Sequence, residues 1–176
     1  MISDYILLVN GSSRPYEHNA RLLRAIIQRY SHIKFKAVLD LSALPLFLAD
    51  KEKERSNEYL INLRSDIKHC KGVIIATPEY IHGIPAILKN ALEWLTPSGE
   101  LQHKKTIAIT YTPHAPRGSK CMLALLETLN GLQAQIICSL QLYQNELMIN
   151  KDLSLHGEEG ILLLNEAIHL INNDVH

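Results

Sequence analysis

Hydroxyl and guanidinium side chains gather in one short polar segment near the start of the sequence. Ser12, Ser13 and Arg14 follow the apolar run Tyr5–Val9, and from Asn19 onward the apolar residues recur at helical spacing. Such groups, placed before the free amides of a helix N-terminus, suit the binding of a phosphate. The alternative is an ordinary strand-to-helix turn with Arg14 in solvent. Asn19 is the expected N-cap of the helix.

The same segment lacks two well-known nucleotide-binding patterns. It has no Gly-Lys-Ser/Thr of a Walker P-loop and no G-x-G-x-x-G dinucleotide pattern. The segment therefore favours a single phosphate at the end of a mononucleotide over a nucleoside triphosphate or a dinucleotide.

A second candidate segment lies between Pro78 and Pro85, directly after another apolar run. The prolines bracket a short irregular backbone whose amides and carbonyls can face the edge of a flat ring, and Tyr80 and Ile81 offer apolar surface. The alternative is that Tyr80 and Trp94 are core aromatics and that the prolines only mark turns. The position directly after a buried strand favours a ligand-binding loop.

The apolar patterns place both segments at joints between strands and helices. Nearly continuous apolar runs predict buried strands, and apolar residues three or four apart predict helices. Strands are expected at Tyr5–Val9, Phe35–Leu39, Val73–Ala76, Thr106–Tyr111 and Ala134–Leu140. Helices are expected at Asn19–Tyr30, Asn57–Cys70, Pro85–Leu95, Met122–Leu129 and Glu158–Ile171, with Gly72 and Gly131 as stops. Residues Lys51–Glu58 form a dense charge run that predicts an exposed surface loop.

Strands that alternate with helices of this length predict an α/β fold, a flavodoxin-like doubly wound five-stranded parallel sheet with helices on both faces. With 176 residues, the chain is expected to form a single domain over residues 1–176. Ligands of such folds lie beyond the carboxyl ends of the strands. Three loops are expected there, and we call them the first loop (Asn10–Asn19), the second loop (Thr77–Ile84) and the third loop (Tyr111–Ser119).

Two motifs together resemble a known family. Gly11-Ser12-Ser13-Arg14 leads to Asn19, and Thr77-Pro78-Glu79-Tyr80 leads through Pro85 to Leu88-Lys89-Asn90-Ala91-Leu92-Glu93-Trp94. This arrangement resembles the NAD(P)H-dependent FMN reductase family, which includes azobenzene and quinone or chromate reductases. The resemblance implies that FMN is bound with its phosphate on the first loop and its isoalloxazine ring on the second. Matched by position, the implied FMN-binding residues are Ser12, Arg14, Asn19, Pro78, Glu79, Tyr80 and Ile81.

The resemblance also implies the reaction and the assembly. NAD(P)H would reduce the flavin by two electrons, and the flavin would then reduce a small-molecule electron acceptor such as a quinone, an azo compound or free flavin. A homodimer or homotetramer in which neighbouring subunits help to wall the site is implied as well. Because the cofactor carries the chemistry, no catalytic side chain is expected, and the sequence contains no Ser-His-Asp, paired-carboxylate or H-E-x-x-H arrangement.

Three positions depart from the family pattern. Glu17 stands where the family often has a small hydroxyl residue, and its charge would repel a phosphate unless it points away. Ile81 stands where many members have Asn, so it can supply backbone contacts but no side-chain amide. The third loop, usually rich in glycine, here contains bulky side chains and one glycine, Gly118. That loop would narrow access for nicotinamide or alter the substrate; Arg117 within it is a candidate for a dinucleotide phosphate, or else a solvated side chain.

The composition of the chain argues against several other classes of function. Lys and Arg (18) balance Asp and Glu (18), which favours neither nucleic acid nor a membrane as a partner. No 18-residue apolar run and no signal peptide is visible, so a cytoplasmic protein is expected. The three cysteines, Cys70, Cys121 and Cys138, and the nine scattered histidines lack metal-ligand spacing, so no metal is expected. Among the histidines, His82 and His114 lie on the expected ligand loops and are candidates for substrate contact or protonation.

Two rival functions stay open at this point. One is an FMN-binding electron carrier or redox sensor without direct NAD(P)H activity, which the bulky third loop favours. The other is a phosphoacceptor receiver on the same fold. It ranks last because neither Val9-Asn10-Gly11 nor Ala76-Thr77-Pro78 offers the acidic cluster and strand-end aspartate that such a domain needs.

Overall fold

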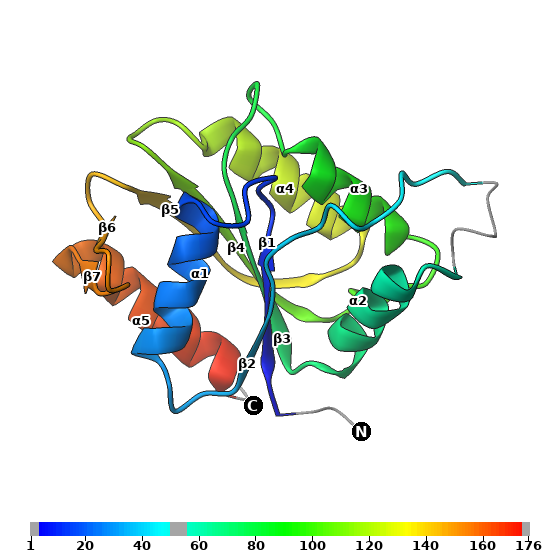
Figure 1. Ribbon diagram of the computed structural model, residues 1–176, viewed down its shortest axis with the longest axis horizontal. Helices are drawn as coiled ribbons and strands as arrows, with labels where there is room; N and C mark the ends of the chain where they lie inside the picture. The colour runs from blue at the N-terminus through cyan, green and yellow to red at the C-terminus, as the bar shows by residue number, and fades with distance from the viewer. Residues whose placement is uncertain (1–3, 50–55, 174–176) are drawn as a thin grey trace.

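The computed structural model describes residues 4–49 and 56–173 and contains a five-stranded parallel sheet with strand order β2-β1-β3-β4-β5 (Figure 1). The strands are β1 Ile6–Asn10, β2 Phe35–Val38, β3 Gly72–Thr77, β4 Lys105–Thr112 and β5 Gln135–Tyr143. The helices are α1 His18–Arg29, α2 Glu58–His69, α3 Ala86–Trp94, α4 Ser119–Gly131 and α5 Glu158–Asn172. This order confirms the flavodoxin-like doubly wound fold.

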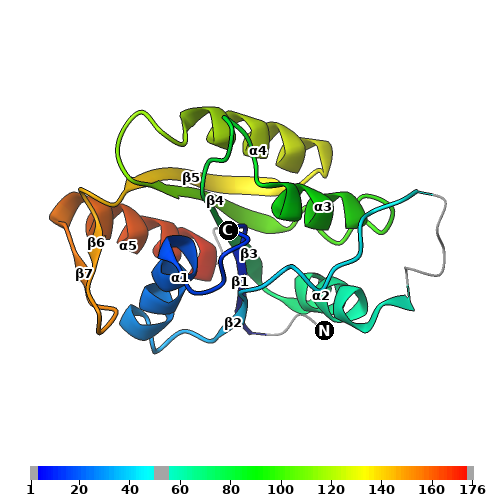
Figure 2. The ribbon, with the colours of Figure 1, turned by 45° about the horizontal axis from the view of Figure 1, so that its top comes forward.

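Two hydrophobic clusters cover the two faces of the sheet. Helices α1 and α5 pack on one face, and α2, α3 and α4 pack on the other, so that the sheet is the middle layer of three (Figure 2). Side chains alternate along the central strands: Leu8 and Ile74 point into the first cluster, and Leu7 and Ile75 into the second. Strands buried on both faces explain the nearly continuous apolar runs in the sequence.

Two expectations about helix ends are wrong. Asn19 is not an N-cap: helix α1 begins one residue before it, and Glu17 occupies the cap position without a side-chain cap bond. The Asn19 side chain instead donates a hydrogen bond to the carbonyl of Tyr111, which competes with the local cap. Gly72 does not end a helix; α2 ends at His69, and Gly72 begins β3, where a Cβ would lie 2.8 Å from the side chain of Ile171. By contrast, the helix expected from Asn57 begins at Glu58, and Asn57 is its N-cap, since its side chain accepts from the amide of Leu60.

A small hairpin was missed. Strands β6 Met148–Ile149 and β7 Leu155–His156 pair antiparallel after β5. Arg21 of α1 fastens this hairpin by donating from Nη2 to the carbonyls of Ile149 and Asn150, at 3.1 and 2.7 Å. Strands of two residues show no alternation, so periodicity does not reveal them.

Two further observations concern the described residues. Residues 50–55, most of the expected charged loop Lys51–Glu58, lie outside them. In the part of the chain that the structure describes, no helix combines the length and the apolar character needed to cross a bilayer. No group of three or more metal-ligating side chains occurs within these same residues.

Candidate functional site

The three loops meet at the carboxyl edge of the sheet, as expected from the topology, along the upper edge of Figure 1. They enclose an open cavity of about 330 Å³, which we call the first cavity. Its walls come from all three loops and from the end of β5. The lining residues are Ser12, Arg14, Glu17, His18, Asn19, Pro78, Glu79, Tyr80, Tyr111, Thr112, Pro113, Arg117 and Gln144.

The first loop is shaped by hydrogen bonds between near neighbours. Asn10 Oδ1 accepts from the amide of Ser12 at 3.1 Å, and Asn10 Nδ2 donates to the carbonyl of Leu39 at 2.8 Å. Ser12 Oγ in turn accepts from the amide of Arg14 at 3.1 Å. Side chains that bond backbone two residues away specify a turn from the sequence itself. The loop therefore delivers Ser12 and Arg14 to the N-terminus of α1, the arrangement expected of a phosphate site.

Arg14 is paired with an acid at the mouth of the first cavity. Its Nη1 lies 2.7 Å from Glu17 Oε2, and both side chains are exposed. The hydrogen bond to Glu17 raises the pKa of Arg14. Glu17 thus points toward Arg14 and solvent, and an incoming anion competes with this carboxylate for the guanidinium.

Asn19 links the first and third loops inside the cavity wall. The residue is 4% exposed, and its Nδ2 donates to the Tyr111 carbonyl at 3.3 Å. Its Oδ1 is buried and accepts no hydrogen bond from the described residues. A buried acceptor without a donor is unfavourable, so a ligand that donates a hydrogen bond here would remove that cost.

The second loop ends in a tight turn with an unusual backbone. The amide and carbonyl of Tyr80 bond the carbonyl and amide of Gly83 at 3.1 and 3.0 Å. The two residues between them, Ile81 and His82, have φ values of 49° and 59°. This left-handed region is unfavourable for a β-branched residue. The Ile81 side chain is fully exposed to solvent, and Ile81 does not line the first cavity.

The two candidate aromatic residues have different roles. Trp94 is buried in the core, where its Nε1 donates to the carbonyl of Pro45 at 2.8 Å. Tyr80 is 39% exposed and lines the first cavity, with its hydroxyl 3.4 Å from Ser12 Oγ. The alternative of a core aromatic therefore holds for Trp94, while Tyr80 joins the first and second loops.

Glu79 uses its carboxylate to hold a helix. Oε2 accepts hydrogen bonds from the amides of Gly118 and Cys121, both at 3.1 Å, at the N-terminus of α4. Oε1 lies 3.5 Å from His82 Nδ1. The carboxylate thus satisfies free amides of the helix and complements its dipole. Glu79 lies in the cavity wall, but these bonds occupy its charged oxygens.

Cys121 packs beneath the second loop. Its thiol donates to the carbonyl of Pro78 at 3.4 Å, and burial together with the charge of Glu79 raises the pKa of this thiol to about 12. The thiol is therefore un-ionised at neutral pH. An un-ionised buried thiol supports the loop by packing and is a poor nucleophile.

Several lining residues were not among the expected site residues. His18 and Glu17 lie at the start of α1, Thr112 ends β4 and Pro113 follows it, and Gln144 follows β5. For Gln144 a signal existed, because residues that follow a parallel strand lie at this edge of the sheet. It was missed because the expected strand ended at Leu140, whereas β5 continues to Tyr143. Of the candidate histidines, neither His82 nor His114 lines the first cavity.

The cavity wall combines groups that suit an anion with a flat, partly apolar surface. Arg14, the hydroxyl of Ser12 and the N-terminus of α1 can bind an anion, and Tyr80 with Pro78 offers a surface for a planar group. No lining serine or cysteine lies within hydrogen-bonding distance of a histidine in the described residues, so the cavity suits ligand binding more than nucleophilic catalysis.

Comparison with known proteins adds independent findings. The family described as NADPH-dependent FMN reductase matches residues 5–146. A protein of Vibrio ruber named NADH:(hydroxy)cinnamate reductase subunit CrdA is 29% identical over 163 residues, covering 91% of this chain and 77% of that protein. A quinone reductase of Escherichia coli is 27% identical over 136 residues, covering 75% of this chain and 72% of the relative.

Solved structures share the fold at low sequence identity. The flavoenzyme NAD(P)H:(acceptor) oxidoreductase FerB of Paracoccus denitrificans superposes with a TM-score of 0.77 at 18% identity, covering 97% of this chain and 96% of that chain. The apo form of an NADH:FMN oxidoreductase gives a TM-score of 0.70 at 18% identity, covering 96% of this chain and 89% of the other. These likenesses support the flavodoxin-like architecture.

Proposed function

Since the chain belongs to the NADPH-dependent FMN reductase family, we propose that the first cavity is the place where it binds FMN. The chain is an FMN-dependent oxidoreductase that uses NAD(P)H. One observation carries the assignment of the site: the three loops at the carboxyl edge of the sheet enclose a cavity that is lined both by Ser12 and Arg14, before the N-terminus of α1, and by Pro78 and Tyr80.

In this proposal the first loop holds the phosphate of FMN. Ser12 and Arg14 donate to it together with the free amides at the start of α1. Asn19 lies deeper in the wall, and its unpartnered Oδ1 fits a ligand that carries hydroxyl groups, as the ribityl chain of FMN does. The residues present therefore fit the group.

The second loop holds the ring. Pro78 and Tyr80 line the cavity with their side chains, while Glu79 and Ile81 contribute backbone, since the carboxylate of Glu79 is engaged at α4 and the side chain of Ile81 points outward. When bound, FMN supplies the electron transfer between NAD(P)H and the acceptor. The chain's own residues bind and orient the reactants and shield them from water on the side of the sheet.

The acceptor is proposed to be a small molecule of the quinone, azo or flavin class. Relatives named quinone reductase, NADPH azoreductase and NADH-dependent flavin reductase subunit support this class. Membership in the reductase family favours this function over an electron carrier without NAD(P)H activity. The bulky third loop, which prompted that alternative, contributes Pro113 and Arg117 to the cavity without filling it.

Three broader features belong to the same proposal. The chain forms a homodimer or homotetramer, which the large exposed apolar side chains of Tyr16, Ile81 and Leu123 support. It works in the cytoplasm, a location that NAD(P)H as co-substrate and the free thiols of its cysteines support. Residues 1–176 form one domain, since both hydrophobic clusters lie on the same sheet.

The test is the behaviour of the flavin in the purified protein. Protein incubated with FMN and freed of excess should retain a flavin absorption spectrum, and anaerobic NADPH or NADH should bleach it without a protein partner. Addition of a quinone should restore the oxidised spectrum. A bound flavin that stays oxidised with excess NADPH and NADH would overturn the reductase function, and a protein that retains no FMN would overturn the site.

A further inference from the structure

A second cavity, of about 430 Å³, lies beside the first cavity on the other side of Glu79. The tip of the second loop and the start of α4 form its walls. Glu79 and Arg117 line both cavities, whereas His82, Ser119 and Lys120 line the second one and not the first. A small molecule that extends past Arg117 can therefore occupy both cavities at once.

The second cavity has more basic than acidic side chains in its wall. Arg117 and Lys120 are exposed, and across residues 4–49 and 56–173 neither side chain has a hydrogen bond or an ion pair with an acid. The acid in the cavity wall is Glu79, whose carboxylate accepts hydrogen bonds from two amides of α4. Two cations without an acidic partner, beside one acid that is engaged at the N-terminus of α4, make the cavity attractive to an anion.

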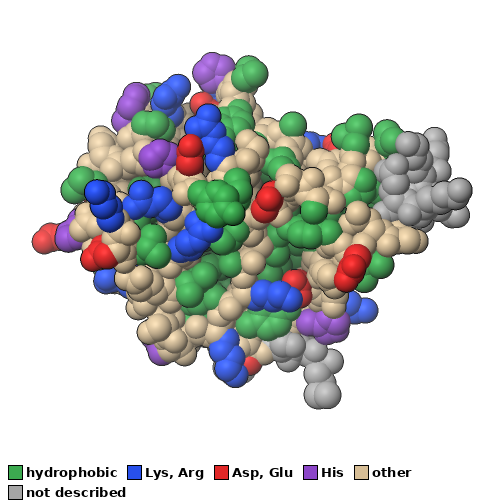
Figure 3. Space-filling view, viewed as in Figure 1, with side chains coloured by type: hydrophobic (Ala, Val, Ile, Leu, Met, Phe, Trp, Pro, Cys, Tyr) green, Lys and Arg blue, Asp and Glu red, His purple; other side chains and the backbone are tan. Residues whose placement is uncertain are grey.

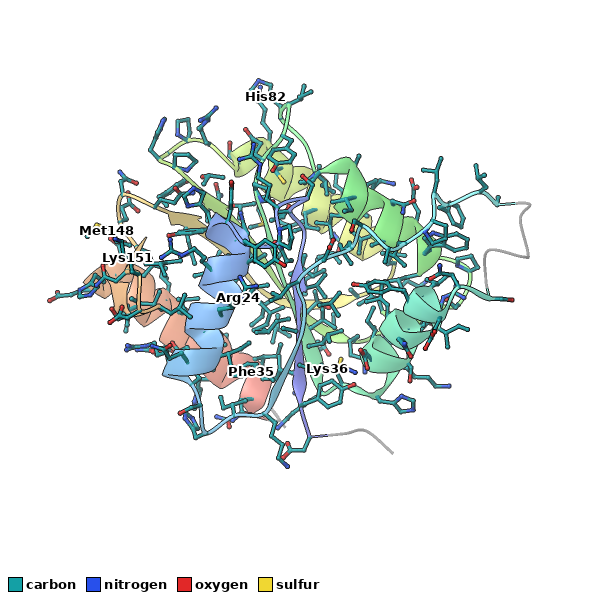
Figure 4. All side chains as sticks on the ribbon, in the orientation of Figure 1. Arg24, Phe35, Lys36, His82, Met148 and Lys151 are labelled. Atoms are coloured by element: carbon teal, nitrogen blue, oxygen red, sulfur yellow. The ribbon has the colours of Figure 1, made fainter. Side chains whose placement is uncertain are left out.

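The surroundings of the cavity have the same character. In the space-filling view, Lys, Arg and His side chains gather around the upper left edge of the molecule (Figure 3). His82 lies at the tip of the second loop, at the top of the molecule, whereas Lys151 lies far from it beside the β6–β7 hairpin (Figure 4). An exposed lysine distant from the cavity is thus available as a matched control.

We propose that the second cavity binds an anionic group, a carboxylate, sulfonate or phosphate, of a small molecule whose planar part stacks on the flavin that the first cavity holds. Arg117 and Lys120 are the specificity-determining residues for this group, and the Ser119 hydroxyl adds a donor. The inference rests on the proposed function, because it concerns molecules that react with the bound flavin. Two sources carry such a group: an acidic aromatic acceptor and the 2′-phosphate of NADPH.

The first measurement is equilibrium binding to the FMN-loaded protein without turnover. The protein is titrated with naphthalene-2-sulfonate and, separately, with neutral 2-naphthol, and the change in flavin absorbance gives each dissociation constant. The ratio of the two dissociation constants is then compared between the wild type and each variant. We expect K120A to reduce the preference for the sulfonate about threefold and R117A/K120A to reduce it about tenfold. K151A should keep the wild-type ratio, and added salt should weaken sulfonate binding in the wild type more than in the double variant.

A charge-reversal variant, K120E, controls for a folding defect in the alanine variants. K120E places an acid in the first turn of α4, where the helix dipole favours it, so this variant should fold while it reverses the charge of the cavity. The KM ratio of NADPH to NADH then distinguishes the sources. A raised ratio in K120E assigns the cavity to the dinucleotide phosphate, and an altered sulfonate ratio alone assigns it to the acceptor.

The outcomes separate this inference from the proposed function. If K120E and R117A/K120A bind the sulfonate and use NADPH like the wild type, the anion site is overturned while the reductase stands. If the wild-type flavin is not reduced by either nucleotide, the proposed function fails, and the titration with naphthalene-2-sulfonate still reports whether the cations hold an anion.

Discussion

The first and second loops lie at the same edge of the sheet, but they are held in place in different ways. In the first loop, Asn10 and Ser12 accept hydrogen bonds from amides two residues away, and Arg14 pairs with Glu17 three residues away. In the second loop, Glu79 bonds amides 39 and 42 residues further along the chain. The first loop pairs its cation with an exposed acid that a ligand can displace, whereas the second loop uses its acid to fix a distant helix.

This difference separates ligand binding from stability. Loss of a group in the first loop should affect the ligand more than the fold, and loss of Glu79 should affect the fold first.

Glu79→Ala should lower the free energy of unfolding by about 2–3 kcal/mol, because it leaves two amides of α4 without an acceptor. Glu79→Gln should recover part of this loss, since its amide oxygen still accepts. The measurement is urea unfolding. Glu17→Ala, an exposed acid of the first loop, is the control and should change stability by less than about 0.5 kcal/mol. Equal losses for the two alanine variants would contradict the difference between the loops.

Arg14→Ala should weaken FMN binding about ten- to hundredfold, the loss expected for a charge-assisted hydrogen bond, with little change in the urea midpoint. Titration of flavin fluorescence gives the dissociation constant. Arg24→Ala removes a cation from α1, the helix that follows the first loop, at a position that does not line the first cavity (Figure 4), and its effect should be less than about threefold. An unchanged constant for Arg14→Ala would remove this residue from the site.

Alkaline pH should lower the stability of the protein, because two buried thiols ionise. Burial raises the pKa of Cys121 from 9.0 to about 12 and that of Cys70 from 9.0 to about 11, so both thiols ionise more readily in the unfolded chain. Their contribution to stability is fully present below pH 9 and is lost as pH rises from 9 toward 12. Urea midpoints measured from pH 8 to 10 should fall, and Cys121→Ser and Cys70→Ser should each make that fall shallower. A midpoint that rises over this range would refute the burial of these thiols.

Ile81→Asn should stabilise the protein by about 1 kcal/mol, because asparagine tolerates the left-handed backbone that isoleucine disfavours. The Ile81 side chain is fully exposed, so little packing is lost. Thermal unfolding gives the shift in Tm. Ile61→Asn, at a half-exposed position inside α2, should instead lower the Tm slightly through weaker helix propensity. If both variants lower it equally, the turn carries no strain.

Glu17→Gln gives the smallest expected effect. Removing the carboxylate that competes for Arg14 should tighten FMN binding about two- to fivefold, the range of an exposed ion pair. The same fluorescence titration, repeated at high salt, should show a smaller gain because salt screens the pair. Weaker FMN binding by Glu17→Gln would mean that Glu17 supports the site.

The sequence predicts the sheet and its helices well, and the reason is physical. Runs such as Tyr5–Val9 are apolar because β1 is buried on both faces, and the helical spacing of Leu22, Leu23 and Ile26 records the face that α1 buries. The strand order follows from the alternation of elements and from right-handed crossovers. These patterns are local, so they can be read before any contact is known.

The parts that sequence reasoning missed depend on contacts between distant residues. Asn19 satisfies the rules for an N-cap, but the Tyr111 carbonyl, 92 residues away, takes its side chain. The acid of Glu79 follows a strand and is expected to face a ligand, yet no local signal reveals that it caps α4. The turn at Ile81 violates the preference of its residue type, so propensity argues against the conformation found.

Gly11 belongs to the first loop and faces α3 and the end of β3, where a Cβ would lie 2.6 Å from Leu88 Cδ2 and 2.9 Å from Thr77 Cβ. A side chain as small as a methyl group would have to push α3 or the end of β3 outward. The lack of a side chain at Gly11 therefore lets the first loop pack directly against the end of β3 and the first turn of α3. Gly11 does not line the cavity, yet a larger residue at this position would displace elements that position its walls.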